Sequence, residues 1–292
     1  MPSLKDSAHI VKQLPNLDSR VLKIFVSSIK HHEIINNQNI LSYSNLHKDR
    51  IDYALQNLLK LKLITKTDKG FKLLTAGLDV YALKLLVDSG IILGIGNSLG
   101  IGKESDVIEA IAENHQPRAV KFFRIGRISF TDTKRKRSLE KNKNVTSWLL
   151  INIEAAKREY DFLVKLKSTK MNITTPYFRS MHSIVMDRIN GLPLIQIRNL
   201  PNPLEIFYKV FEQMRIAYNE NVINSDVSEY NVLLDENQDI WIIDWPQAVT
   251  LEHPNAEFLL RRDLHNIIRY FRRKYDLNID ENSYYKSLVK DN

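Results

Sequence analysis

Three polar side chains in one acidic stretch have the types and spacing that could bind a divalent cation beside a reacting carboxylate. Asp226 and Asn231 form the pattern D-x-x-x-x-N, and Asp244 follows a predicted short hairpin. The oxygens of Asn231 and Asp244 are hard ligands of the kind that Mg²⁺ accepts while it keeps part of its water shell. Asp226 is then left to orient a nucleophile or to accept its proton. Taken alone, the pattern is equally compatible with turn chemistry.

An earlier glycine-rich segment could hold a polyanion. Five of the nine glycines lie in residues 90–102, and Gly100, Gly102 and Ser105 occupy the positions of a G-x-G-x-x-G loop, with serine third. A backbone without Cβ atoms can bend tightly and bring its N–H groups close to phosphates. Such a glycine pattern alone is a weak signal.

Two charged residues between these segments complete a recognisable order. Lys121, in a predicted strand, could neutralise phosphate charge, and Glu159, in the next predicted helix, is its expected partner because a buried lysine requires one. Each could also be an ordinary solvated side chain. Glycine loop, lysine, glutamate and the D…N…D set appear in the order found in protein-kinase-like phosphotransferases. The 48 residues after Asp244 leave no room for the usual activation loop and peptide-binding helices.

Composition narrows the classes of protein. The 292 residues include no cysteine, which excludes disulfides, thiolate zinc sites, iron–sulfur clusters and cysteine nucleophiles. The 43% apolar content is too high for a disordered chain, and no apolar run is long enough for a membrane span. The N-terminus lacks the apolar region of a secretory signal, so we expect a cytoplasmic protein with no membrane association.

Charge is distributed unevenly along the chain. The net charge is +8, yet residues 216–260 contain nine acids and no Lys or Arg, so the remaining residues together carry +17. A basic excess of this size favours a polyanionic partner such as nucleic acid. Residues 118–143, with a local charge of +8, read as a mobile loop that is either solvated or in contact with phosphates. Ser129 and Ser138 in this loop are candidate modification sites.

The predicted elements fall into two groups. Residues 1–87 give helix, helix, hairpin and helix, with a turn at Asp68-Lys69-Gly70 and Thr75 as the expected N-cap of the closing helix. This order is typical of a winged helix-turn-helix, which binds nucleic acid or docks on proteins. Basic residues near its second helix favour nucleic acid: Lys48, Arg50, Lys60 and Lys62. Later, Asn202-Pro203-Leu204-Glu205 carries the signals of a helix start.

Several segments resemble the second subfamily of the RIO family of atypical kinases. The similar segments are Leu-Gly-Ile-Gly-Lys-Glu-Ser-Asp-Val around the glycine loop, Ala-Val-Lys-Phe-Phe-Arg around Lys121, and Ile-Ile-Asp-Trp-Pro-Gln-Ala-Val around Asp244. The resemblance implies an α+β fold with an N-terminal winged helix-turn-helix domain, residues 1–87, and a compact two-lobed kinase-like domain, residues 88–292. The lobes would span about 88–186 and about 191–292.

The resemblance also implies site roles. Asp226 corresponds to the catalytic aspartate, Asn231 to the metal-binding asparagine, and Asp244 to a metal ligand that carries the phosphoryl group transiently. The loop residues near the phosphates would be Lys103, Glu104 and Ser105, and Met186 to Ile189 would meet the adenine. The expected cofactors are ATP and Mg²⁺, with Mn²⁺ as an alternative to Mg²⁺.

The implied activity is that of an autophosphorylating serine/threonine kinase and ATPase. It would act in maturation of the small ribosomal subunit, bind its rRNA and pre-ribosome, and be a monomer. The chain departs from the family at Asn224-Ser225, where His-Gly is usual, and at Asp187, where glutamate is common. Two alternatives stay open: a small-molecule phosphotransferase, and a non-catalytic winged-helix nucleic-acid binder with a degenerate kinase fold.

Overall fold

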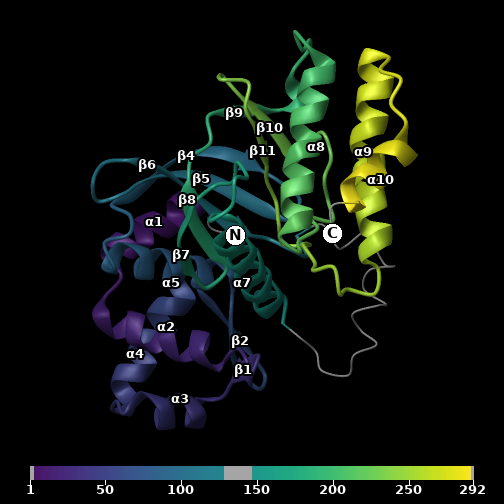
Figure 1. The fold of residues 1–292 in the computed structure, drawn as a ribbon. Helices are drawn as coiled ribbons and strands as arrows, with labels where there is room; N and C mark the ends of the chain where they lie inside the picture. The colour runs from purple at the N-terminus through teal and green to yellow at the C-terminus, as the bar shows by residue number, and fades with distance from the viewer. Residues whose placement is uncertain (1–2, 128–146, 291–292) are drawn as a thin grey trace. The chain divides into compact units, whose positions relative to one another are not determined.

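The structure is a computed structural model that describes residues 3–127 and 147–290 (Figure 1). Ser129, Ser138 and most of the basic segment around them lie outside the described residues. The chain divides into two compact units. The first unit comprises Met1–Ala156 and Phe178–Val185, and the second comprises Lys157–Tyr177 and Met186–Asn292.

The first unit begins with a winged helix. Its elements are α1 (Leu4–Gln13), α2 (Asn16–Ser28), β1 (Ile34–Ile35), α3 (Asn37–Ser44), α4 (Lys48–Lys60), β2 (Ile64–Thr67), β3 (Gly70–Leu73) and α5 (Thr75–Asp88). Apolar side chains at helical spacing, among them Leu22, Phe25 and Leu58, are almost fully buried in one core. The predicted winged helix is therefore confirmed, while α1, α3 and β1 were not predicted. The expectation that Thr75 caps α5 is wrong, because the helix begins at Thr75 and Leu74 occupies the cap position.

The wing is held by one glycine. The strands pair in the order β1-β3-β2, and the β2–β3 turn lies where the Asp68-Lys69-Gly70 signal placed it. Gly70 has φ of +142°, and a Cβ atom there would lie 2.3 Å from the carbonyl oxygen of Ile35. Only glycine fits this position without moving β1.

A five-stranded sheet completes the first unit. Its strands run in the order β4-β5-β6-β8-β7. They are β4 (Gly94–Ile101), β5 (Ser105–Ile111), β6 (Pro117–Phe123), β7 (Pro176–Ser180) and β8 (Ser183–Asp187). Helix α5 contributes to the winged-helix core through Leu78 and to the core over the sheet through Leu83 and Leu86. The proposed domain boundary at residue 88 stays a prediction, and α5 joins both cores.

The second unit is mainly helical. Its elements are the C-terminal part of α7 (Trp148–Leu166), β9 (Gly191–Pro193), a 3₁₀ turn (Leu194–Gln196), α8 (Pro203–Asn219), β10 (Val232–Asp235), β11 (Ile240–Ile242), α9 (Ala256–Tyr275) and α10 (Glu281–Val289). Helix α8 starts as predicted, with Asn202 Oδ1 accepting from the backbone N–H of Glu205 at 3.4 Å and Pro203 in the first turn. Helices α8 and α9 lie side by side (Figure 1), and Phe207 and Phe271 are buried between them.

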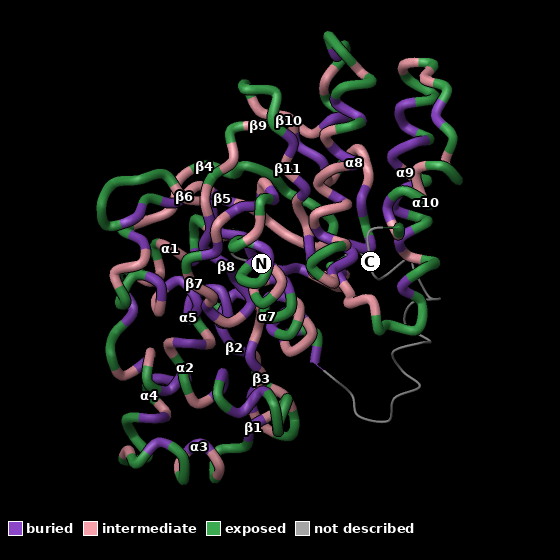
Figure 2. The backbone as a smooth tube through the Cα atoms, in the orientation of Figure 1, coloured by how far each residue is buried: buried purple, intermediate pink, exposed green. Residues whose placement is uncertain are grey.

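Buried and exposed positions alternate along α2, α4, α8 and α9, whereas α5 is buried continuously from Ala76 to Leu83 (Figure 2). Along the described residues, none of the helices combines the length and apolar character needed to cross a bilayer.

Candidate active site

The glycine loop is the β4–β5 turn. Strand β4 ends at Ile101 and β5 begins at Ser105, so Gly102, Lys103 and Glu104 form the turn. The N–H of Gly102 donates to the carbonyl oxygen of Ser105 at 2.8 Å, which closes the turn tightly. A Cβ atom at Gly102 would lie 3.2 Å from that same oxygen, so the glycine permits the close approach. Lys103 is exposed, and Glu104 and Ser105 are half-buried.

The sheet register places Lys121 on the same face as this loop. Gly100 pairs with Val107, and Val107 pairs with Lys121. Directly paired residues of antiparallel strands project from the same face, so these three positions form a row across β4, β5 and β6. Lys121 is only 3% exposed, and its Nζ lies 5.0 Å from the ring centroid of Phe123. A buried ammonium group on the sheet face that Gly100 shares is suited to neutralise phosphate charge.

Glu159 is also almost fully buried, at 2% exposure, on α7. It belongs to the second unit, whereas Lys121 belongs to the first. The ion pair between them therefore stays a prediction, favoured by the cost of burying either charge alone.

Asp226 and Asn231 lie together in the second unit. The Nδ2 of Asn231 donates to Oδ2 of Asp226 at 3.0 Å and to its backbone carbonyl oxygen at 2.9 Å. Because the Nδ2 group of Asn231 faces Asp226, its Oδ1 points away from these bonds and can act as a metal ligand. The D-x-x-x-x-N spacing thus corresponds to a closed loop in which the two side chains touch.

Asp244 reaches the same loop through the β10–β11 hairpin. Val232 pairs with Ile242, and the N–H of Ile243 donates to the carbonyl oxygen of Asn231 at 2.9 Å, which sets Asp244 beside that asparagine. Asp244 adopts a left-handed φ of +62°. A non-glycine residue in this region costs free energy and is often found at functional sites.

Asn224 joins the two aspartate segments. Its Nδ2 donates to the carbonyl oxygen of Asp244 at 2.9 Å, and its Oδ1 accepts from the N–H of Asp226 at 3.1 Å. The side chain is 3% exposed. One buried amide therefore fixes both main chains.

Sequence reasoning missed the residues on α9 that hold this loop. Asp263 accepts from the N–H of Ser225 at 2.7 Å and from that of Val227 at 3.2 Å, Arg262 donates to the carbonyl oxygen of Ser225, and Asn266 donates to that of Val227 at 3.3 Å. Burial raises the pKa of Asp263 to about 7 against the lowering effect of these N–H donors. The available signal was a charged residue, 1% exposed, on the apolar stripe of α9.

The residues expected to meet the adenine lie at the boundary between the units, which falls between Val185 and Met186 in β8. Met186 is buried and Ile189 half-buried. Asp187 accepts from the hydroxyl of Tyr177 at 2.8 Å, and its main chain bonds to Thr174 and Thr175. The hinge role of this segment stays a prediction.

Mg²⁺ fits the donor set formed by Asn231 and Asp244. The described residues contain no cluster of three or more His, Cys, Asp or Glu side chains that could hold a metal ion unaided. Mg²⁺ is commonly bound by one or two protein oxygens and completes its shell with water and substrate phosphates. One amide oxygen and one carboxylate are compatible with this mode of binding.

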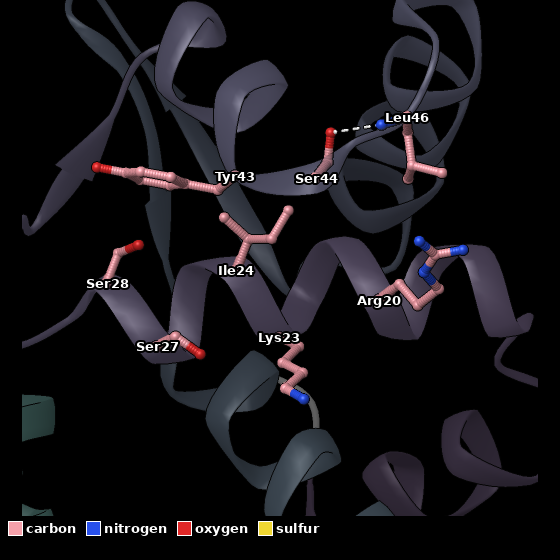
Figure 3. Close-up of a pocket in the computed structure, with 8 residues that line it drawn as sticks. All are labelled: Arg20, Lys23, Ile24, Ser27, Ser28, Tyr43, Ser44 and Leu46. Carbon is pink, nitrogen blue, oxygen red and sulfur yellow. Dashed lines mark hydrogen bonds between the residues drawn. The ribbon is translucent and has the colours of Figure 1, made fainter.

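A separate hollow of about 350 Å³ lies in the winged helix between α2 and α3 (Figure 3). Its lining comprises Arg20, Lys23, Ile24, Ser27, Ser28, Tyr43, Ser44 and Leu46. None of the residues selected from the sequence lines it, and the Ser44 hydroxyl is already bonded to the N–H of Leu46 at 3.2 Å.

Comparison with known proteins shows the family to which the chain belongs. The family model of the RIO domain matches residues 106–284, and that of the Rio2 N-terminal domain matches residues 11–89. The RIO-type serine/threonine-protein kinase Rio2 of Methanocaldococcus jannaschii is 34% identical, over 90% of this chain and 100% of the relative. The serine/threonine-protein kinase RIO2 of Saccharomyces cerevisiae is 30% identical, over 92% of this chain and 66% of the relative.

A solved structure is similar along nearly the whole chain. The Rio2 kinase–ADP/Mg²⁺–phosphoaspartate complex from Chaetomium thermophilum has a TM-score of 0.85 at 28% identity, and the match covers 97% of this chain and 88% of that one. The chain therefore belongs to the RIO family of atypical serine/threonine kinases and, within it, to the Rio2 subfamily.

Proposed function

We propose that this kinase uses ATP with Mg²⁺ and works both as an autophosphorylating serine/threonine kinase and as an ATPase. The observation that carries the proposal is the convergence of Asp226, Asn231 and Asp244, held through Asn224 and the β10–β11 hairpin. Catalysis of phosphoryl transfer consists mainly of positioning and charge neutralisation. Both are what a rigid set of two carboxylates and an amide can supply.

The residues have distinct roles in this proposal. Asp226 orients the attacking hydroxyl or water and takes its proton, while Asn231 and Asp244 hold the metal ion. Bound Mg²⁺, or Mn²⁺ in its place, neutralises phosphate charge. Lys121 and the glycine loop, Gly100 to Ser105, hold the phosphates, and Met186 and Ile189 contact the adenine. Glu159 keeps Lys121 oriented.

We further propose that Asp244 accepts the γ-phosphoryl group transiently. One carboxylate oxygen of Asp244 forms a bond to the γ-phosphorus while the bond from that phosphorus to the β,γ-bridging oxygen breaks and ADP leaves. Water then attacks the acyl phosphate, releases inorganic phosphate and restores the carboxylate. The phosphoaspartate named in the Chaetomium thermophilum Rio2 complex supports this step.

Turnover measurements with purified protein, ATP and Mg²⁺ test the proposal. Asp226→Ala should lower steady-state ATP turnover by about 10²–10⁴-fold, because proton transfer from the attacking water is lost, and leave nucleotide affinity largely intact. Asp244→Ala should abolish both turnover and the hydroxylamine-sensitive phosphoprotein. Equal loss of turnover and nucleotide binding in Asp226→Ala would make that residue structural.

The partner proposed is the small ribosomal subunit and its rRNA, met in the cytoplasm by a monomeric enzyme during subunit maturation. The net charge of +8 supports it, as do four basic residues in or next to α4 that are all exposed: Lys48, Arg50, Lys60 and Lys62. Phosphate contacts of this kind dominate binding to nucleic acid.

The two alternatives make different predictions. A non-catalytic nucleic-acid binder would bind RNA with no ATP turnover in either the unaltered protein or Asp244→Ala. A small-molecule phosphotransferase would release ADP in stoichiometric step with phosphorylation of an aminoglycoside or choline-like acceptor, which an acceptor screen would detect.

A further inference from the structure

A buried charge network connects the winged helix to the phosphate loop in the first unit. Arg124, directly after β6, is 7% exposed, and Asp79, in the second turn of α5, is 2% exposed. Arg124 Nη1 donates to Asp79 Oδ1 at 2.7 Å and Nη2 donates to Oδ2 at 3.1 Å. This bidentate pair is the strong form of the arginine–carboxylate interaction.

The same arginine holds the end of the β4–β5 turn. Its Nε donates to Asp106 Oδ2 at 3.0 Å, and its backbone N–H donates to the carbonyl oxygen of Glu104 at 2.6 Å. Arg127 adds a second clamp, with Nη1 at 2.6 Å from Asp106 Oδ1 and 3.4 Å from the carbonyl oxygen of Gly102. Two guanidinium groups thus hold the turn that should receive the phosphates, through Asp106 and the carbonyl oxygen of Gly102.

The network is neutralised internally. Despite desolvation, which acts in the opposite direction, hydrogen bonds and charge from His182 and Arg124 hold the pKa of Asp79 below its usual value, so the carboxylate is ionised. His182 Nε2 lies 2.8 Å from Asp79 Oδ1, and burial lowers the pKa of this imidazole. The guanidinium group of Arg124 is therefore paired with the carboxylates of Asp79 and Asp106, and we do not expect it to bind phosphate.

We propose that Asp79 and Arg124 are positioning residues through which α5 of the winged helix holds Gly102–Ser105 in the conformation that receives the nucleotide phosphates. This inference rests on the proposed nucleotide site. It assigns the winged helix a part in nucleotide affinity that is distinct from any contact with RNA.

Nucleotide titrations separate positioning from simple stabilisation. In Asp79→Asn, the dissociation constant for a fluorescent ATP analogue with Mg²⁺ should rise at least about tenfold, a change equal to about 1.4 kcal/mol. KM for ATP should rise in parallel, and kcat should change by less than about threefold. Asp88→Asn removes an exposed ion pair with Lys84 on the same helix and should leave all three values unchanged.

A double variant provides the decisive comparison. Asp79→Leu combined with Arg124→Met replaces the buried ion pair by apolar side chains of similar size, which often preserves or raises stability. If Asp79 and Arg124 position the turn, this variant should regain thermal stability but keep the weak nucleotide affinity. The reason is that Asp106 no longer accepts a hydrogen bond from Arg124. Affinity that returns with stability overturns the inference, as does unchanged affinity in Asp79→Asn.

If the double variant does not fold, Arg124→Lys replaces it, and an unchanged dissociation constant there contradicts the inference. Absence of nucleotide binding by the unaltered protein would instead refute the proposed function.

Discussion

Asn224 and Ser225 stand where the resemblance to the RIO family predicts His-Gly. Asn224 bonds to the main chains of both Asp226 and Asp244, so its side chain fixes the two aspartate segments relative to each other. Ser225 has φ of +64°, a backbone conformation that glycine adopts freely and serine does not. The serine is held there by bonds from its main chain to Asp263 and Arg262. The active loop is therefore strained and anchored by α9.

Ser225→Gly should stabilise the protein. The substitution removes the left-handed strain of a Cβ residue, and it removes a buried Oγ that has no hydrogen-bond partner among the described residues. Glycine also raises the conformational entropy of the unfolded chain, which lowers stability. The two gains should outweigh this cost, so the free energy of unfolding should rise by about 1 kcal/mol. Urea unfolding of the full chain measures it. Ser228→Gly, in the same loop without positive φ, should destabilise, and a loss of stability in Ser225→Gly would contradict the account.

Asp263 makes stability depend on pH in a defined window. Burial raises its pKa from 3.8 to about 7, with the charge of Asp226 acting in the same direction and Arg262 against it. At pH values between these two pKa values, the Asp263 carboxyl is protonated in the folded chain and ionised in the unfolded chain. The free energy of unfolding should therefore fall as pH rises from 5 to 7, by about 2 kcal/mol, and level off above.

Urea unfolding at several pH values tests this for the unaltered protein and Asp263→Asn. The variant should lack this part of the pH slope. Glu257→Gln, at an exposed position on the same helix, should keep the slope of the unaltered protein. Identical slopes in all three proteins would exclude Asp263 as the group responsible.

At the scale of elements, the sequence predicts a helix start or a turn correctly where residues close together in the chain determine it. The Asn202-Pro203-Leu204-Glu205 start of α8 and the β2–β3 turn follow from capping and turn chemistry within four residues. Helix α10 was missed because it is short and its placement depends on Tyr284 packing edge-on against Phe207 and Phe211 of α8. Such contacts, formed between distant segments, leave little periodic signal.

The site shows the same division between local and distant causes. The convergence of Asp226, Asn231 and Asp244 could be predicted because one loop and one hairpin connect them. Asp263 and the Asp79–Arg124 pair could not, since their partners lie 36 or more residues away along the chain. A charged residue within an apolar stripe marks such positions but does not name the partner.

Gly70→Ala should disrupt the wing. The residue adopts φ of +142°, and the new Cβ would meet the Ile35 carbonyl oxygen at 2.3 Å. The loss should be about 2 kcal/mol or more. Unfolding by urea gives the value, with Gly94→Ala as control, because nothing lies within 4 Å of a Cβ there. Equal effects of the two substitutions would contradict the assigned role of Gly70.

At the scale of the whole molecule, charge separates two functions. The acidic stretch contains the carboxylates proposed to act in catalysis and is suited to a metal ion, whereas the rest of the chain carries +17, which favours the proposed RNA partner. Because the basic excess lies outside residues 216–260, RNA association and nucleotide turnover should respond to different substitutions.

RNA association should depend steeply on salt. If six or more phosphates are contacted, affinity for small-subunit rRNA should fall by about 10³-fold or more between 50 and 200 mM salt. Filter binding or fluorescence anisotropy measures the slope. Charge reversal at Lys48 and Arg50 should reduce it, while reversal at Lys167 and Lys170 in the second unit serves as the control. A flat salt response would remove RNA from the account.

A crystal structure of the chain with ATP and Mg²⁺ tests the central claim most directly. The account predicts one ion at about 2.1 Å from Asn231 Oδ1 and an Asp244 carboxylate oxygen, bound to the triphosphate, with Lys121 on the same phosphates and Asp226 facing the γ-phosphorus. An ion held by other residues, or a nucleotide bound away from Asp226 and Asp244, would contradict it.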